Sequence, residues 1–564
     1  MYEKFDAALF DELQSIYPDT STKEGVKHYR VSSANGGYAG VHIMLNGLKP
    51  GIPVTVEVIG DHRSYRLFNM AALPVEVNTG AKQRSEYLKD DINEYVIRRA
   101  PFMVYDVYRP MFNILNPTGV TAAIAFRAKT EYIRKFHTRK WTFIISHAGE
   151  TQKLEFVVDE YPVRIPSTQE QKQRYVNWFN YGVVAKNHGL EPWSAAHYNM
   201  IKKYFDVLVY SRQNMAPIHP IYGLVDGKPV LDIEKMEKIV DLAIEAGFTW
   251  FNGTAFTGRA SGQDDDQAFF DSLPHDTFEG PEEVSEAFKK AAFDAFDYGT
   301  DALCLGELIP GEKGEAYLKD LSEQMYEFVN RKGLNDRWLQ CCMDEPNDAL
   351  ENTYRRIVDI MHEAMPGIKM LEPMLPTHAL DDTIEVWCPS LDIYEQDKEY
   401  YDAQVAKGVE LFVYSCLTPG GNYSNILLDM EHLRQVWLCW APILYPNITG
   451  FLHWASVGSN ELYERSAKQF VPKPMDFFEK YAMMLPAGDC GCIFSWGDMP
   501  CVTARTEGMR IGYEDLGLLE QLPYEEALAI CKKVFNGYAN YTKDIALYRK
   551  VKDELMKAVM AKAE

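Results

Sequence analysis

The chain has 564 residues, of which 46% are hydrophobic and 13% aromatic, so it is long enough for two or three domains with sizeable cores. Its formal net charge is −23 and no block of lysine and arginine stands out, which argues against nucleic acid and anionic membranes as partners. The sequence shows no signal peptide and no apolar stretch long enough to span a bilayer, so we expect a soluble, cytoplasmic protein without membrane insertion.

Residues 1–165 consist of short runs of alternating polarity, separated by turns rich in glycine, proline and asparagine. Residues 54–59 alternate apolar and polar side chains and lead into the turn Gly60-Asp61. Short strands at regular spacing are typical of an antiparallel β-sandwich. We predict a sandwich over residues 1–165 with a structural or sugar-binding accessory role, followed by a polar linker or helix start over residues 167–174.

A different periodicity begins at residue 175 and continues to residue 480. Helical stretches of ten or more residues, such as 233–246, 281–298, 315–332 and 349–365, alternate with short apolar runs. Eight such runs predict strands: 207–210, 248–251, 302–305, 339–343, 370–372, 384–387, 410–414 and 449–454. This count favours a (β/α)8 barrel. A doubly wound sheet would usually carry a glycine-rich turn after its first strand, and the sequence 211–215 has none.

In a barrel of this kind, functional side chains follow the C-terminal ends of the strands. The residues at those positions are polar, acidic or aromatic: Arg212, Asn214, Asn252, Glu307, Asp344, Glu345, Glu372, Asp392, Tyr394, Tyr414 and Trp454. A structural rim would also be polar, but it would not need so many amides, carboxylates and aromatic rings at one mouth. We therefore expect a substrate cavity there. Residues 258–280 form a long loop whose acidic run lacks the spacing of a calcium site.

The run 338–346 holds the most specific chemistry. It starts as a buried strand and ends in Asp344 and Glu345, after which Pro346 cannot donate to a ladder and closes the strand. Neighbouring strand residues point to opposite faces, but at a frayed end both can lean toward one cavity. Two carboxylates at the mouth of a barrel indicate acid/base catalysis. Taken alone, the motif would also suit a solvated turn.

The last part of the chain, residues 481–564, is expected to be a small extension with strands and helices that packs on the barrel. The charges of residues 503–515 suggest an ion-pair network that fastens the last strands to the barrel, and residues 523–564 have a helical pattern. Most of the ten cysteines lie in apolar runs, as reduced thiols do, and Cys490, Cys492 and Cys501 include no Cys-x-x-Cys pair. We expect no metal and no other cofactor.

Several motifs together resemble the family 123 glycoside hydrolases, the β-N-acetylgalactosaminidases, over most of the chain. The matching stretches are Glu191-Pro192-Trp193-Ser194, Asp344-Glu345-Pro346, Tyr414-Ser415-Cys416, Gly450-Phe451-Leu452-His453-Trp454, Pro486-Ala487-Gly488-Asp489, Arg505-Thr506-Glu507 and Glu514-Asp515. The sequence departs from the family pattern at Met343, at 455–458 and at 494–497, which lie near the expected sugar pocket. The sugar therefore stays open between N-acetylgalactosamine, N-acetylglucosamine and another glycoside.

The resemblance implies a retaining exo-hydrolase in which the 2-acetamido oxygen of the sugar attacks its own anomeric carbon. Asp344 would orient the acetamido group and stabilise the oxazolinium intermediate, and Glu345 would protonate the leaving oxygen and then activate water. Tyr414 is expected to donate to the acetamido oxygen, and Trp454 to stack under the sugar. The expected partner is a glycan or glycolipid headgroup; the oligomeric state is not predicted.

Two other functions fit the same residues. A conventional retaining enzyme would use Glu345 as acid/base and Glu372, Glu307 or Asp392 as nucleophile, on a sugar without the acetamido group. A carbohydrate-binding protein on an inactive hydrolase fold would bind sugar without turnover, although the intact Asp344-Glu345 pair argues against it.

Overall fold

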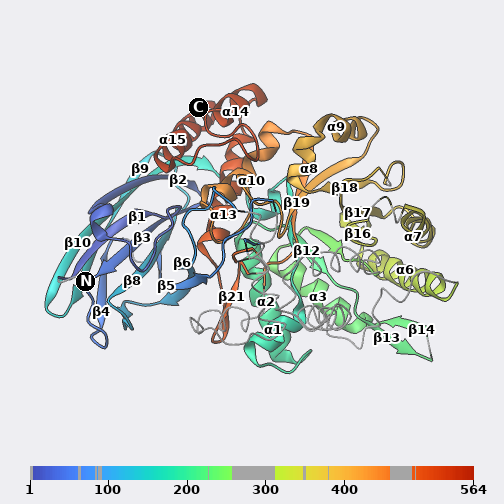
Figure 1. Ribbon diagram of the computed structural model, residues 1–564, viewed down its shortest axis with the longest axis horizontal. Coiled ribbons are helices and arrows are strands. Elements are labelled where there is room, and N and C mark those ends of the chain that lie inside the picture. Colours follow the sequence, from blue (N-terminus) through green and yellow to red (C-terminus); the bar gives the residue numbers. More distant parts are fainter. Residues whose placement is uncertain are drawn as a thin grey trace.

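The computed structural model describes residues 4–60, 65–82, 85–86, 92–226, 228–256, 312–346, 348, 351–378, 380–457, 486–488 and 491–563. Two five-stranded sheets come first, and an eight-stranded parallel barrel with surrounding helices follows (Figure 1). The C-terminal helices lie between the sheets and the barrel. In the part of the chain that is described, no helix is long and apolar enough to cross a membrane.

The two N-terminal sheets pack their inner faces into one core. One sheet has the order β1-β3-β8-β5-β6 and contains β1 (Asp6–Asp11), β3 (Tyr38–Asn46), β8 (Thr121–Lys129), β5 (Tyr65–Val75) and β6 (Phe102–Met111). The other has the order β2-β10-β9-β4-β7 and contains β2 (His28–Asn35), β10 (Glu150–Arg164), β9 (His137–His147), β4 (Val54–Ile59) and β7 (Ile114–Leu115). In β4 the valines are buried and the residues between them exposed, because side chains alternate along a strand. Valines, phenylalanines and a tryptophan from both sheets form a single hydrophobic cluster.

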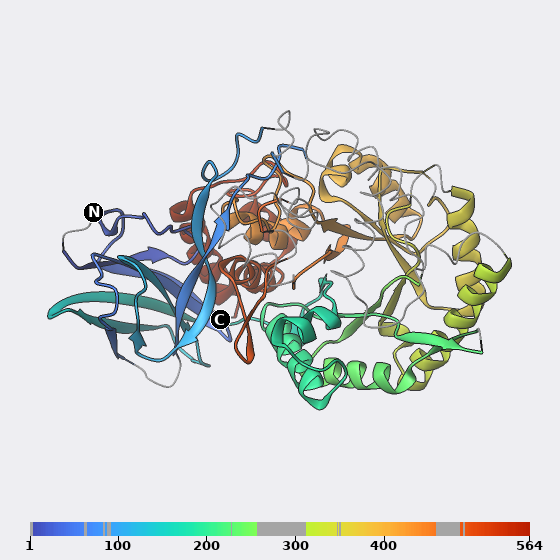
Figure 2. The same ribbon diagram turned by 60° about the horizontal axis from the view of Figure 1, so that its bottom comes forward.

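The barrel strands all run parallel, in the order β11-β20-β19-β18-β17-β16-β15-β12. They are β11 (Arg174–Asn177), β12 (Met215–Ile218), β15 (Trp250–Gly253), β16 (Trp338–Cys341), β17 (Lys369–Met374), β18 (Val386–Pro389), β19 (Glu410–Ser415) and β20 (Ile448–His453). Helices alternate with these strands, namely α1 (Tyr181–His188), α2 (Ala195–Tyr210), α3 (Ile233–Ala246), α6 (Glu312–Lys332), α7 (Glu351–Ala364), α8 (Leu391–Gln396), α9 (Lys398–Ala406) and α10 (Leu433–Leu444). Figure 2 shows the helices, green to yellow, arranged around the strands.

The first predicted strand, 207–210, is wrong, because these residues form the last turn of α2. Ile201, Tyr204, Phe205 and Leu208 are buried at helical spacing, so the apolar run belongs to a 3.6-residue period that a four-residue window does not reveal. The strands at this position are instead β12 and β11; no strand was predicted over β11, which begins at the last residue of the predicted linker. Six further predicted strands match β15 to β20 within a few residues, and the predicted strand 302–305 lies outside the described residues.

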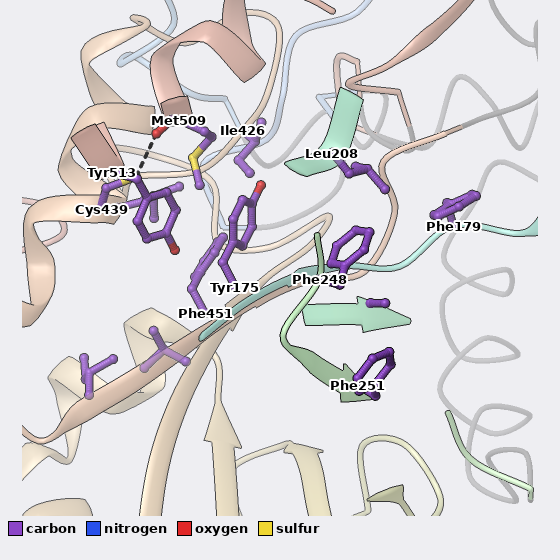
Figure 3. Packing of buried hydrophobic residues seen from close by; sticks show 14 of the residues in the cluster. Tyr175, Phe179, Leu208, Phe248, Phe251, Ile426, Cys439, Phe451, Met509 and Tyr513 are labelled. Carbon is purple, nitrogen blue, oxygen red and sulfur yellow. Dashed lines mark hydrogen bonds between the residues drawn. The ribbon is translucent and has the colours of Figure 1, made fainter. Parts of the chain in front are cut away.

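The C-terminal region contains the hairpin β21 (Phe494–Trp496) and β22 (Met499–Cys501) and the helices α13 (Ala504–Leu519), α14 (Tyr524–Cys531) and α15 (Ile545–Ala563). Almost every residue of α13 is buried. Tyr513 of α13 stacks on Tyr175 of β11, with ring centroids 5.1 Å apart, and Cys439 of α10 donates to the Met509 carbonyl (Figure 3). The expected ion-pair network is present, but it lies on a helix and fastens α13 to the N-terminal sheets, as with Arg505 and Asp106 of β6 at 3.0 Å.

Candidate active site

The segment after β16 forms a tight turn that presents the two predicted catalytic carboxylates. The ladder between β16 and β17 ends with the pair Cys341 and Leu371. Beyond it, Asp344 and Glu345 have φ angles of 87° and 45°. Residues other than glycine rarely adopt such left-handed values, each of which costs about 1–3 kcal/mol and persists only where the surroundings hold it.

Two consecutive residues of β17 hold this turn. The Asp344 N–H donates to Glu372 Oε1 at 2.8 Å, and the Met343 N–H donates to Glu372 Oε2 at 3.0 Å. The Glu345 N–H donates to the Pro373 carbonyl at 3.0 Å. The strained backbone is therefore fixed at three successive amides.

Glu345 is the more enclosed of the two catalytic candidates. It is 9% exposed, and its Oε1 accepts a hydrogen bond of 2.6 Å from the hydroxyl of Tyr414, which lies on β19. Asp344 is partly exposed. The structure thus brings Tyr414, 69 positions away in the sequence, to Glu345, and it leaves Asp344 nearer to solvent than Glu345.

The barrel interior next to this turn is lined by a small core with aromatic rings at its edge. Leu339 and Cys341 of β16 belong to it together with Tyr414, and the partly buried Trp178 and Trp454 pack against it. Trp454 therefore packs against the same interior cluster as Tyr414. Its contact with a sugar stays a prediction.

Asn252, at the C-terminal half of β15, is fully buried beside this core. Its Oδ1 accepts a 2.7 Å hydrogen bond from Trp178 Nε1, and its Nδ2 donates to the Leu339 carbonyl at 3.3 Å. Asn252 thereby fixes the orientation of the Trp178 ring. Sequence reasoning missed Trp178, since no strand was predicted over residues 174–177; a strand assigned there would have placed this tryptophan at the mouth.

Glu372 lies behind the barrel wall and not at its mouth. Its neighbour Leu371 belongs to the interior core, whereas Met370 and Met374 belong to the outer core between strands and helices. Since side chains alternate along a strand, Glu372 faces outward with the two methionines. It is 0% exposed, and burial, followed by the nearby charge of Asp344, raises its pKa to about 8 against the opposing effect of the backbone N–H donors.

Arg212 and Asn214 do not follow a barrel strand, and their predicted place at the mouth is wrong. They lie between α2 and the N-terminal end of β12, because residues 207–210 are helical. Arg212 donates to the Pro166 carbonyl at 2.6 Å. Asn214 Oδ1 accepts from the Tyr175 N–H at 2.8 Å, so its amide bridges β12 and β11 and helps to close the barrel.

The remaining predicted site residues, Tyr394, Asp392 and Glu307, do not help to define a substrate cavity. Tyr394 is fully buried on α8, where it packs against Tyr445 at 5.4 Å between ring centroids. Asp392 accepts the Ser390 hydroxyl in the first turn of the same helix. Glu307 lies outside the described residues. No group of three or more histidine, cysteine, aspartate or glutamate side chains in the described ranges could hold a metal ion.

Comparison with known proteins identifies related sequences and folds. The profile "Glycoside hydrolase 123, catalytic domain" matches residues 178–522, more than half of the chain. A solved structure of a family 123 glycoside hydrolase from Clostridium perfringens is 12% identical, covers 99% of this chain and 98% of its own, and has a TM-score of 0.67. This similarity supports the fold. No curated protein matched the sequence.

Other solved structures are much less similar. A GH10 xylanase from Thermobacillus composti is 11% identical, covers 62% of this chain and 100% of its own, and has a TM-score of 0.33. A β-glucuronidase from Parabacteroides merdae is 10% identical, covers 74% of this chain and 45% of its own, and has a TM-score of 0.28. Scores this low carry no argument about function.

Proposed function

Because the chain belongs to glycoside hydrolase family 123, we propose that it removes terminal β-linked N-acetylgalactosamine from glycans or glycolipid headgroups by a retaining, substrate-assisted reaction. The glycoside hydrolase class follows from the family. The mechanism is supported by the arrangement of the carboxylates, and the sugar is carried over from the resemblance of the sequence motifs to the family. The Clostridium perfringens family member has been described in glycolipid glycan hydrolysis, and we carry that substrate class over as part of the proposal.

The unequal placement of the carboxylates is the observation that carries the proposal. Asp344 and Glu345 share one turn next to the barrel interior, whereas Glu372 faces outward with both oxygens bound to backbone N–H groups. An outward, fully buried carboxylate is not placed to attack a sugar in the barrel. Glu372 therefore does not supply the second carboxylate of a conventional retaining pair. In the proposed reaction, the acetamido oxygen of the substrate takes that role.

In this reaction each residue has a separate task. Asp344 holds the acetamido N–H and stabilises the positive charge that develops on the oxazolinium ring. Glu345 donates its proton to the glycosidic oxygen and, in the second step, accepts a proton from the attacking water. Tyr414 holds the Glu345 carboxyl through the 2.6 Å hydrogen bond, which fixes the direction of proton transfer. This bond differs from the predicted one to the acetamido oxygen.

The direct test compares two aryl glycosides that differ only in the acetamido group, a 4-nitrophenyl β-N-acetylgalactosaminide and a 4-nitrophenyl β-galactoside. We expect cleavage of the first only, with inhibition by a thiazoline mimic of the oxazoline. Asp344→Asn should lower kcat by about a hundredfold or more. Glu345→Gln should abolish cleavage of substrates with poor leaving groups while the fold survives.

Each other outcome has a definite meaning. Cleavage of the galactoside, unaffected by the thiazoline, would overturn substrate assistance and assign the nucleophile to another carboxylate. Preferential cleavage of the corresponding N-acetylglucosaminide would contradict the proposed specificity for N-acetylgalactosamine, but the proposed substrate-assisted mechanism would still stand. Sugar binding without turnover would show that the protein is a carbohydrate-binding member of the family.

A further inference from the structure

We infer that Glu372 is a positioning residue for the catalytic turn: from behind the barrel wall, its carboxylate holds the backbone that aims Asp344 and Glu345 into the barrel. The inference rests on the proposed function, because it assigns a role in that reaction. Glu372 itself touches neither the sugar nor the reacting atoms under this assignment.

The first argument comes from the hydrogen bonds at the end of β16. The regular ladder with β17 stops at Cys341 and Leu371. Beyond this point the Glu372 carboxylate accepts the hydrogen bonds instead: one oxygen accepts from the Met343 N–H at 3.0 Å and the other from the Asp344 N–H at 2.8 Å. A side chain that replaces a ladder can hold a backbone geometry that a strand cannot adopt.

The second argument is the conformation that these bonds hold. Asp344 and Glu345 are two consecutive residues in the left-handed region, with no glycine in the turn. Strain of this kind persists only where the surroundings over-determine it, and it concentrates at active sites. The Asp344 N–H, one of the two amides that Glu372 binds, belongs to a residue in this strained region.

The third argument is the absence of a cation beside Glu372. Several other buried carboxylates among the described residues pair with arginine, as Glu507 does with Arg510 at 2.7 Å and Asp106 with Arg505 at 3.0 Å. Among the described residues, no lysine, arginine or histidine forms an ion pair with Glu372, whose partners are backbone amides and the Tyr354 hydroxyl. A buried carboxylate without a counter-ion is unfavourable for stability, and such a group beside a candidate active site points to a functional reason.

The test measures kcat and KM of Glu372→Gln on the acetamido substrate. Glutamine keeps the shape and one acceptor oxygen, but its NH2 group faces one of the two backbone N–H groups, so the turn loses a bond. We expect kcat to fall by about 10- to 100-fold, as for a displacement of catalytic groups by about 1 Å, with KM changed less than about threefold. The concentration of folded active sites is determined by titration with the thiazoline, and kcat is calculated per active site, so that unfolded protein does not lower the measured value.

Glu160→Gln is the matched control. Glu160 is a buried carboxylate of β10, 2% exposed, that pairs with Arg139 and lies far from the barrel mouth in the N-terminal sheet. This variant should lose stability without a change in kcat per active site. It separates the general effect of neutralising a buried glutamate from the effect on the turn.

If Glu372→Gln does not fold, Glu372→Asp provides the second variant, because it keeps the charge and withdraws both acceptor oxygens by one bond; it should show the same loss of kcat. Wild-type kcat per active site in either folded variant would overturn the inference. A wild-type enzyme that is active only on the plain galactoside would overturn the proposed function instead, and the same variants would then be measured on that substrate. Wild-type protein without activity on either substrate would overturn both.

Discussion

Two buried carboxylates, Glu372 in the barrel wall and Glu507 at the junction of the domains, have opposite electrostatic surroundings. Both are almost inaccessible to solvent. Around Glu507, burial alone would raise the pKa, but Arg127 and Arg510 outweigh it and lower the pKa. Around Glu372, burial has no cation to oppose it, and the pKa rises to about 8.

The difference shows what each carboxylate is for. Glu507 connects α13 to Arg127 of β8 at 2.6 Å and to Tyr210 of α2 at 2.9 Å, so it joins the N-terminal sheets, the barrel and the C-terminal helices. Removing one member of such a network leaves buried charges unpaired. Glu372 of β17 binds backbone amides of the turn that follows the neighbouring strand β16. The first carboxylate secures the assembly of the domains, and the second shapes a turn.

The largest expected effect is at the junction. Glu507→Gln should lower the free energy of unfolding by about 3–5 kcal/mol, because the buried Arg127 loses its counter-charge and the buried Arg510 loses one of its carboxylate partners. Urea unfolding followed by fluorescence measures the loss. Glu237→Gln, at the exposed pair with Arg331, is the control and should leave the midpoint nearly unchanged. Equal midpoints for the Glu507 and Glu237 variants would show that the junction network adds no stability.

A contact without charges tests whether the junction also depends on close packing. Gly420 lies in the segment after β19, next to the segment that connects β5 and β6. A Cβ atom added at Gly420 would lie 2.1 Å from the Gly80 carbonyl oxygen. Gly420→Ala should therefore destabilise the protein by about 1–3 kcal/mol, a typical cost of overpacking. Gly223→Ala, where a Cβ would meet nothing within 4 Å, is the control. A thermal midpoint unchanged in Gly420→Ala would contradict this packing.

Two tyrosines allow the comparison to be made with the same substitution. Tyr414 donates to Glu345 at 2.6 Å, and Tyr210 donates to Glu507 at 2.9 and 3.0 Å. Tyr414→Phe should lower kcat by about 10- to 100-fold, because it removes a group that orients the general acid. Tyr210→Phe should lower stability by about 0.5–1.5 kcal/mol and leave kcat unchanged. Equal losses of kcat in Tyr414→Phe and Tyr210→Phe would show that the active-site tyrosine and the junction tyrosine do not have different roles.

The stability of the protein should also depend on pH through Glu372. The folded pKa of Glu372, about 8, lies above its ordinary value of 4.5, so the folded state binds more protons than the unfolded state between these values. The contribution of Glu372 to stability therefore falls as pH rises through this window, by at most about 1.4 kcal/mol per pH unit. The titratable groups that interact electrostatically with Glu372 are Asp344 and Cys342 of the turn, Cys341 of β16, Tyr354 of α7 and Cys388 of β18.

Burial raises the pKa values of these thiols and of the Tyr354 phenol, so they stay neutral in the window. The measurement is the free energy of unfolding of wild type minus that of Glu372→Gln, from pH 5 to pH 8. We expect this difference to fall steadily with pH. A flat difference would show that Glu372 keeps the same charge in the folded and unfolded states.

Local patterns in the sequence determined much of this protein. The motif Asp344-Glu345-Pro346 after an apolar run placed the catalytic turn at the end of a strand, and the structure has β16 ending at Cys341. The predicted helix 233–246 coincides with α3, since an apolar face at helical spacing, an aspartate cap and a terminal glycine all lie within one short window. Features of this kind depend on neighbours along the chain, and so they can be predicted from it.

Only the tertiary structure decided which face each side chain presents and which strand it meets. The sequence placed Glu372 at the mouth, but the alternation of β17 turns it to the outer core, where it binds the neighbouring turn. Trp178 and Asn214 likewise acquired their partners at β11, a four-residue strand that is too short and too mixed in polarity to signal a strand by itself. Burial and hydrogen-bond partners come from residues tens to hundreds of positions away, and local periodicity contains no information about them.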